Sequence, residues 1–156
     1  MSVARTIPWQ EWVLKQQMQN VAGGTSVPGN GLDLAIVILN YNTRDLLAAC
    51  LESVYASEGD FCFSLCVVDN ASQDRSSQMV AERFPQAGLI ACPENRGYSA
   101  GNNRAIRQLG FGESGTLPAG LPRYVLLLNP DTALPPDALA RMIAFMDERP
   151  QAGMAG

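Results

Sequence analysis

Short apolar runs alternate with longer amphipathic segments from Leu32 to the end of the chain. The apolar runs, several of them rich in β-branched residues, predict four strands at residues 34–39, 63–68, 88–92 and 123–128. The amphipathic segments predict four helices at residues 44–56, 74–84, 98–109 and 136–148. Alternating strands and helices are typical of βαβ units, so the pattern predicts an α/β fold with a mostly parallel sheet and flanking helices.

The pattern differs before residue 32. Trp9, Trp12 and Val13 form one apolar face of a predicted short helix, which we expect to pack on the domain or on a partner, with docking to a membrane as the less favoured alternative. A stretch rich in Gly, Ser, Pro and Asn follows and has the composition of a flexible linker. The chain therefore divides into an N-terminal segment with linker, residues 1–31, and a domain, residues 32–156. The domain is expected to be truncated, because a further strand should follow the last helix.

Composition argues against several classes of function. Eleven basic residues against fifteen acidic ones give a net charge of −4 without any basic block, so nucleic acid is not an expected partner. The chain contains no His, which excludes a Ser-His-Asp triad and the helical zinc-protease motif within it. The only Lys, Lys15, does not follow a glycine-rich turn, so a P-loop is excluded as well.

The cysteines and the hydropathy indicate a compartment. The four cysteines lack the paired spacing of a zinc or thioredoxin-like site, and buried reduced thiols are expected. No signal peptide is visible, and no apolar run approaches the ~20 residues that a membrane-spanning helix needs. These features predict a cytoplasmic location.

Polar clusters follow all four predicted strands, at residues 40–43, 69–72, 93–97 and 129–132. Each cluster alone suits a turn or a helix N-cap, and Ser72 or Asp74 could cap the helix predicted at 74–84. Ligands of an open parallel sheet, however, bind outside the carboxyl ends of its strands. Four such clusters at one edge therefore predict a polar crevice with hydrogen-bonding groups for a base, a ribose and a diphosphate.

These residues resemble the family 2 glycosyltransferases, which have the GT-A fold, a Rossmann-like α/β arrangement. Four motifs match in order: IVILNYN at 36–42, VVDNASQD at 67–74, NRGYSAGNN at 95–103 and LLNPD at 127–131. The last motif occupies the place of the family's D-x-D, and the resemblance covers about residues 33–156. It implies an N-terminal, donor-binding portion of a GT-A domain, truncated after the D-x-D-like motif.

The resemblance implies roles for individual residues. Asp69 would accept a hydrogen bond from the imide N–H of uracil or thymine. Asp131 would bind Mg²⁺ or Mn²⁺ bridging the diphosphate, since such ions take oxygen ligands. The residues expected to line the nucleotide-sugar site are Asn40, Tyr41, Asn42, Asp69, Asn70, Arg96, Gly97, Asn102, Asn103, Asn129 and Asp131. The first acid of the D-x-D is replaced by Asn129, a variant that is similar to the rhamnosyltransferase-like branch of the family.

The family transfers a sugar with inversion from a nucleotide donor to an acceptor hydroxyl. The resemblance implies a dTDP- or UDP-sugar donor, rhamnose being one option, and a glycan or lipid-linked acceptor of bacterial polysaccharide or cell-wall synthesis. A lipid-linked acceptor would add peripheral association with the inner face of the membrane. The family's carboxylate base lies beyond the D-x-D and is expected downstream of Asp131, so no catalytic residue is assigned in this chain.

The sequence argues against two other classes of α/β protein and leaves one alternative open. A nicotinamide-dependent dehydrogenase would need G-x-G-x-x-G after the first strand, where residues 40–44 contain no glycine. A receiver-like signalling domain would need a Lys after a late strand, and Lys15 is the only one. A non-catalytic glycosyltransferase-like nucleotide-binding module, or a fragment of a longer enzyme, stays open as the alternative to an active transferase.

Overall fold

A computed structural model describes residues 2–14, 31–111 and 121–155. Within these residues five strands form one sheet, and every pairing between them is parallel. The strands are β1 (Arg5–Thr6), β2 (Leu34–Asn40), β3 (Cys62–Asp69), β4 (Gly88–Ala91) and β5 (Tyr124–Leu128). Their order is β1-β3-β2-β5, and β4 pairs with the later part of β3, on the edge that β1 occupies earlier.

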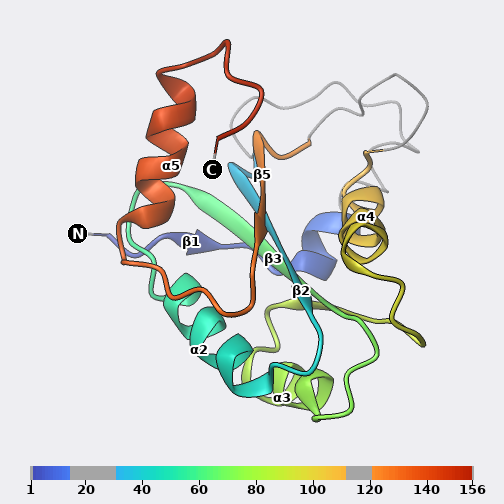
Figure 1. Ribbon diagram of the computed structural model, residues 1–156. Coiled ribbons are helices and arrows are strands. Elements are labelled where there is room, and N and C mark those ends of the chain that lie inside the picture. The colour runs from blue at the N-terminus through green and yellow to red at the C-terminus, as the bar shows by residue number, and fades with distance from the viewer. Residues whose placement is uncertain (1, 15–30, 112–120, 156) are drawn as a thin grey trace.

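Helices cover both faces of the sheet (Figure 1). They are α2 (Arg44–Tyr55), α3 (Ser76–Arg83), α4 (Tyr98–Gln108) and α5 (Ala138–Asp147), and residues 9–14 are also helical. Helices α2, α3 and α5 lie on one face, and α4 lies on the other together with residues 9–14. The α/β prediction is confirmed, and the predicted strand and helix bounds differ from the observed ones by no more than two residues.

The two faces of the sheet contribute to two separate hydrophobic clusters. Alternate side chains of β2 divide between them: Leu34, Ile36 and Ile38 pack with α2, α3 and α5, whereas Ala35 and Val37 pack with α4. Burial on both faces explains why the central strands are continuous apolar runs, as is usual for parallel sheets. The same alternation later decides which side of the sheet each polar residue faces.

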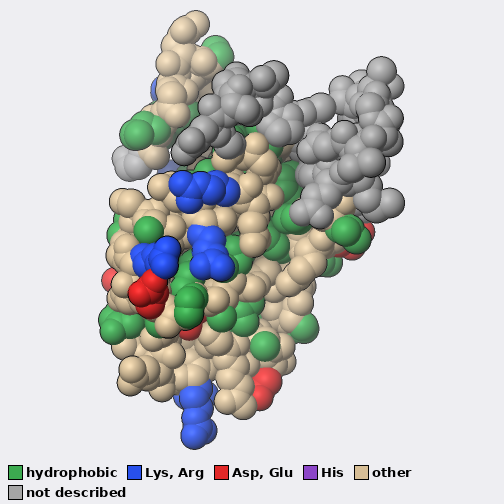
Figure 2. Space-filling model, turned by 90° about the vertical axis from the view of Figure 1, so that its right-hand side faces the viewer, with side chains coloured by type: hydrophobic (Ala, Val, Ile, Leu, Met, Phe, Trp, Pro, Cys, Tyr) green, Lys and Arg blue, Asp and Glu red, His purple; other side chains and the backbone are tan. Residues whose placement is uncertain are grey.

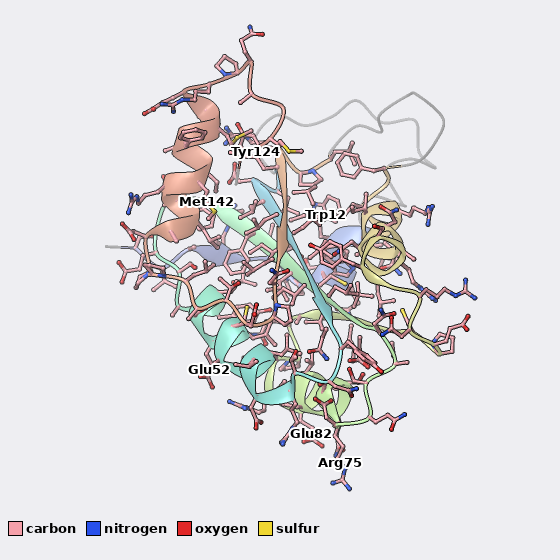
Figure 3. The ribbon with its side chains drawn as sticks, in the orientation of Figure 1. Trp12, Glu52, Arg75, Glu82, Tyr124 and Met142 are labelled. Carbon is pink, nitrogen blue, oxygen red and sulfur yellow. The ribbon has the colours of Figure 1, made fainter. Side chains whose placement is uncertain are left out.

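The N-terminal segment adds to this second cluster. Trp9 and Trp12 are 3% and 4% exposed, and Figure 3 shows Trp12 between the sheet and α4. Ile7 N donates to the carbonyl of Phe63 at 2.8 Å, which continues the β1 pairing. The predicted packing of this segment on the domain is therefore observed. The linker predicted up to residue 31 lies outside the described residues, apart from Gly31.

None of the helices in the described ranges is both long enough and apolar enough to cross a bilayer. The four cysteines are free thiols, and three are buried while Cys92 is half-buried.

Gly88 lets Trp9 close over the start of β4. A Cβ atom at Gly88 would lie 2.4 Å from Cγ and 2.8 Å from Cβ of Trp9, so a larger residue must push the indole away. We predict that Gly88→Ala lowers the free energy of unfolding by about 1–3 kcal/mol, the range for overpacking. Because the chain's two Trp residues both lie in this segment, their fluorescence should shift to longer wavelength as well. Urea unfolding followed by fluorescence measures both effects.

The matched control is Gly153→Ala, because no atom lies within 4 Å of a Cβ at Gly153. This variant should match the parent in stability and emission. An unchanged Gly88→Ala protein would show that Trp9 does not pack on β4 in solution.

Candidate functional site

The strand register brings the polar clusters side by side. Asn40 pairs with Asp69, Asp69 pairs with Ala91, and Ile38 pairs with Leu128, so four strands end at nearly the same level. The loops that follow them lie at the lower side of the sheet in Figure 1. The four polar clusters predicted to form a crevice therefore lie at one edge of the sheet, although they are far apart in the sequence.

Asp69 is the centre of a buried hydrogen-bond network. Its side chain faces α2 and α3, like the other odd-numbered residues of β3, and the residue is 3% exposed. Oδ1 accepts from Asn40 Nδ2 at 2.8 Å, while Oδ2 accepts from Ser77 Oγ at 2.8 Å and from Ser72 N at 3.2 Å. A carboxylate has about four acceptor positions, so one position on Oδ1 is left. Asp69 thus braces the site before any ligand is present.

Asn40 is fully buried and bonded on both ends of its amide. Nδ2 donates to Asp69 and also to Ser72 Oγ at 3.0 Å, and Oδ1 accepts from Thr43 Oγ1 at 2.7 Å. The structure therefore buries this predicted site residue, and both polar atoms of its side chain are hydrogen-bonded within the protein. Tyr41, the next residue, is 50% exposed.

The loops after β2 and β3 are cross-linked by their side chains. Asn42 N donates to Ser72 Oγ at 2.9 Å, and Gln73 N donates to Asn42 Oδ1 at 2.7 Å. Asn42 and Ala71 have φ values of 54° and 67°, in the left-handed region that non-glycine residues rarely adopt. Strained backbone of this kind persists where surrounding contacts determine it, and it gathers at functional sites.

Asp74 adds a further link between these loops. Its carboxylate accepts from Arg44 N at 2.8 Å and from Ser76 N at 3.0 Å. Desolvation raises the pKa of Asp74, but hydrogen bonds from Ser76 and Arg44 outweigh it and leave the pKa lowered. The link is therefore present at neutral pH and is lost in acid as the carboxyl protonates. Neither Ser72 nor Asp74 is the N-cap of α3, which is Arg75, but Asp74 precedes it and accepts from the first helical N–H, that of Ser76.

Asn70 faces the other side of the sheet, toward α4. Its Nδ2 donates to Asn95 Oδ1 at 2.7 Å, and its Oδ1 accepts from Arg96 N at 3.3 Å. Gly97 follows with φ 82° and ψ 178°, a combination essentially confined to glycine. The buried amide of Asn70 and the glycine together fix the loop between β4 and α4.

The remaining motif residues of α4 separate into buried and exposed positions. Asn102 is buried, and its Nδ2 donates to the carbonyl of Tyr98 at 3.1 Å. Gly101 packs against β2, since a Cβ there would lie 2.3 Å from Leu39 Cδ1. Asn103 is exposed, and so is Arg96, whose Nε donates to Glu94 at 2.7 Å.

The D-x-D-like segment lies over α2. Asn129 and Asp131 are both exposed, and Cys50 Sγ of α2 approaches the carbonyl of Asn129 at 3.7 Å. Burial raises the pKa of the Cys50 thiol to about 11, and the negative charge of Asp131 nearby acts in the same direction. Within the described residues no group of three His, Cys, Asp or Glu side chains could hold a metal ion. An ion at Asp131 would complete its coordination with oxygen ligands from water or a bound phosphate.

A separate pocket of about 580 Å³ lies at the opposite, amino ends of the strands. Arg5, Asp33, Asp60 and Arg123 line it, and Arg123 is engaged by Asp33 at 3.0 Å and by Asp147. None of the strand-end motif residues lines this pocket. Asp33 joins the starts of two strands there, because it pairs with Arg123 and also accepts from Cys62 N at 2.9 Å.

The structure joins the predicted residues in two groups. Asn40 bonds to Asp69, and Asn70 bonds to Arg96 and the Gly97 carbonyl, whereas Asn129 and Asp131 share no described contact with either group. Sequence reasoning did not assign Ser72, Ser77 or Asn95 to the site, although all three complete its hydrogen bonds. Ser72 and Asn95 belong to the strand-end clusters and could have been assigned from them. Ser77 lies within a predicted helix, where nothing in the sequence marks it as a partner of Asp69.

Comparisons with known proteins support the same family. The chain is 32% identical over 116 residues to the succinoglycan biosynthesis protein ExoO of Rhizobium meliloti, a match covering 74% of this chain and 30% of that protein. It is 30% identical over 95 residues to N-acetylglucosaminyl-diphospho-decaprenol L-rhamnosyltransferase of Mycobacterium tuberculosis, covering 60% of this chain and 30% of that protein. The chain thus spans less than a third of the length of these curated relatives.

Solved structures share the fold. A mannosyltransferase, PcManGT, from Pyrobaculum calidifontis in complex with GDP-Man and Mn²⁺ has a TM-score of 0.59 at 21% identity, over 88% of this chain and 40% of that one. Residues 1–349 of S. aureus TarS in complex with UDP-GlcNAc have a TM-score of 0.60 at 23% identity. This match covers 75% of this chain and 32% of that one. The fold is that of the GT-A glycosyltransferases, a parallel sheet with flanking helices.

The family match rests on most of the chain. The profile described as "Glycosyl transferase family 2" matches residues 35–156, which include all four strand-end motifs. The protein belongs to glycosyl transferase family 2.

Proposed function

We propose that the protein is a glycosyltransferase and that the crevice at the ends of β2, β3, β4 and β5 binds the nucleoside diphosphate of its sugar donor. The observation that carries this proposal is the Asn40–Asp69–Ser72 network, which holds two loops in strained conformations at the edge where parallel sheets bind ligands. The relatives support it, since one is named as a rhamnosyltransferase and one structure contains UDP-GlcNAc.

The base would lie against the loop after β2. Tyr41, half exposed, offers a ring on which a base can stack. The unused acceptor position of Asp69 Oδ1 points to a partner with an N–H, such as N3 of uracil or thymine. Asn42, Arg96 and Gly97 would border the ribose and the base.

The diphosphate would extend toward the end of β5. Asp131 is exposed and supplies a hard oxygen ligand, so it fits a Mg²⁺ or Mn²⁺ ion held by one carboxylate and by phosphate oxygens. When bound, such an ion neutralises the charge of the leaving nucleoside diphosphate. Asn129 would add a neutral amide oxygen beside it, which makes the site less negative than one built from two aspartates.

The reaction class follows from the family. We infer transfer of a hexose, rhamnose being one candidate, from a dTDP- or UDP-linked donor to a hydroxyl of a glycan or lipid-linked acceptor, with inversion. The residues of this chain bind and orient the donor, and no base is assigned among them. A lipid-linked acceptor would place the protein at the inner face of the cytoplasmic membrane.

Metal-dependent nucleotide binding should depend on Asp131. We predict that the chain binds UDP at least ~10-fold more tightly with Mn²⁺ than without it, and that Asp131→Asn removes this difference because the ion loses its only carboxylate. Asp137→Asn is the matched control, since Asp137 is exposed on the same segment and pairs only with Arg141 within the described residues. Calorimetric titration of the three proteins measures the effect. Equal metal dependence in both variants would count against the role of Asp131.

Base selection should follow the protonation of N3. A carboxylate acceptor at Asp69 favours UDP, which has an N3–H, over CDP, whose N3 is an acceptor. We predict a preference of at least ~10-fold for UDP, which corresponds to about 1.4 kcal/mol. Competition titrations with the unaltered chain measure it, and equal affinities would remove Asp69 from base recognition.

Asp69→Asn tests the bracing role separately. An amide cannot accept from both Ser72 N and Ser77 Oγ once its oxygen stays with Asn40, so the variant should lose about 1–3 kcal/mol of stability. Ser99→Ala, an exposed change on α4, is the control and should leave stability unchanged. Urea unfolding decides the point, and an Asp69→Asn protein as stable as the parent would contradict the network.

A further inference from the structure

A second pocket, of about 550 Å³, opens between the loop after β4 and the side of α4. Three arginines, Arg96, Arg104 and Arg107, line it together with Glu94. Figure 2 shows the α4 face of the molecule, where arginine side chains (blue) gather. The chain as a whole carries a net charge of −4, whereas the side chains that line this pocket carry a net positive charge.

Two of the arginines have no carboxylate partner in the part of the chain that the structure describes. Arg96 is bound to Glu94, but Arg104 and Arg107 form no ion pair with any of the described residues. Arg104 Nη1 donates a long hydrogen bond, of 3.9 Å, to the sulfur of Cys92. Like charges one turn apart on a helix are destabilising by a few tenths of a kcal/mol, so this pair has a cost in the free chain. An anion between them would remove that cost.

The shape and chemistry of the pocket suit a phosphate group. Ala100 and Gly101, which have small side chains or none, line the pocket beside the arginines and leave space for a ligand. Guanidinium groups present fixed forks of N–H donors that match phosphate oxygens in paired, charge-assisted hydrogen bonds. Arginine is also less strongly hydrated than lysine, which favours its use at such a contact.

The pocket is not where the donor diphosphate would bind at Asp131. In the order β4-β3-β2-β5, three strand spacings separate the end of β4 from the end of β5. At about 4.8 Å for each spacing, the two places are roughly 14 Å apart across the sheet. The pocket nevertheless adjoins the crevice, because Asn70 and Arg96 belong to both.

We propose that Arg104 and Arg107 form a second anion site, which binds a phosphate monoester or diester independently of the donor nucleotide. Such a group is carried by soluble phosphate compounds and by anionic lipid headgroups. The site would hold a phosphate-bearing molecule beside the crevice while the donor occupies Asp131 and the loop after β2.

The test compares two double variants with the same change of charge. Arg104→Gln/Arg107→Gln removes the proposed site, and Arg141→Gln/Arg149→Gln removes two exposed arginines of the α5 segment on the opposite face. The probes are inorganic pyrophosphate, titrated calorimetrically, and phosphatidylcholine vesicles with or without phosphatidylglycerol, assayed by sedimentation. We expect the first variant to lose at least ~10-fold in affinity for one or both probes and the second to keep the parent's affinity.

The outcomes are distinct. Loss of pyrophosphate binding assigns the site to soluble phosphates, and loss of binding only to the phosphatidylglycerol vesicles assigns it to a headgroup. Absence of binding by the parent chain, or equal loss in both double variants, overturns the proposal. UDP titration with Mn²⁺ separates it from the donor site, because Arg104→Gln/Arg107→Gln should leave UDP affinity unchanged. A parallel loss of UDP affinity would show that the arginines belong to the donor site and would also overturn the proposal.

Discussion

The hydrogen bond from Asn40 Nδ2 to Asp69 Oδ1 is the contact on which the rest of the site depends. A buried carboxylate is tolerated only with hydrogen-bond partners, and Asp69 finds them in β2, in its own following loop and in α3. Bonds of this charged kind contribute about 1.5–3 kcal/mol each. Because the parallel register sets Asn40 opposite Asp69, the folding of the central strands itself brings these two side chains together.

Successive side chains of a strand point to opposite faces of the sheet, so the neighbours Asp69 and Asn70 hold loops on opposite sides of it. Asp69 faces α2 and α3 and ties its own following loop to β2 and α3, whereas Asn70 faces α4 and fixes the loop that contains Gly97. A shift of one residue in register would exchange these faces and break the hydrogen bonds of both side chains. The apolar alternation of β2 and β3 between two clusters is what prevents that shift. Packing of the core thus determines where the polar groups of the site point.

The sequence predicts the central fold well because each element carries its own periodic signal. Strand β1, with only two residues, carries none, and the fit of Trp9 onto Gly88 joins positions that no local pattern connects. The strand-end position of Asn40 and Asp69 is also predictable, but their burial is not. Spacing tells which end of a strand a residue occupies, and only the packed structure shows that its hydrogen bonds are made within the protein.

The central claim is that the four strand ends form one nucleotide-binding crevice. It is tested most directly by following the backbone amide signals of the ¹⁵N-labelled chain during titration with UDP and Mg²⁺. The account predicts shifts in the four strand-end segments, residues 40–44, 69–75, 95–103 and 129–132, and little change elsewhere. Shifts confined to the opposite pocket around Arg5, Asp33 and Arg123, or no shifts in the folded chain, would contradict it.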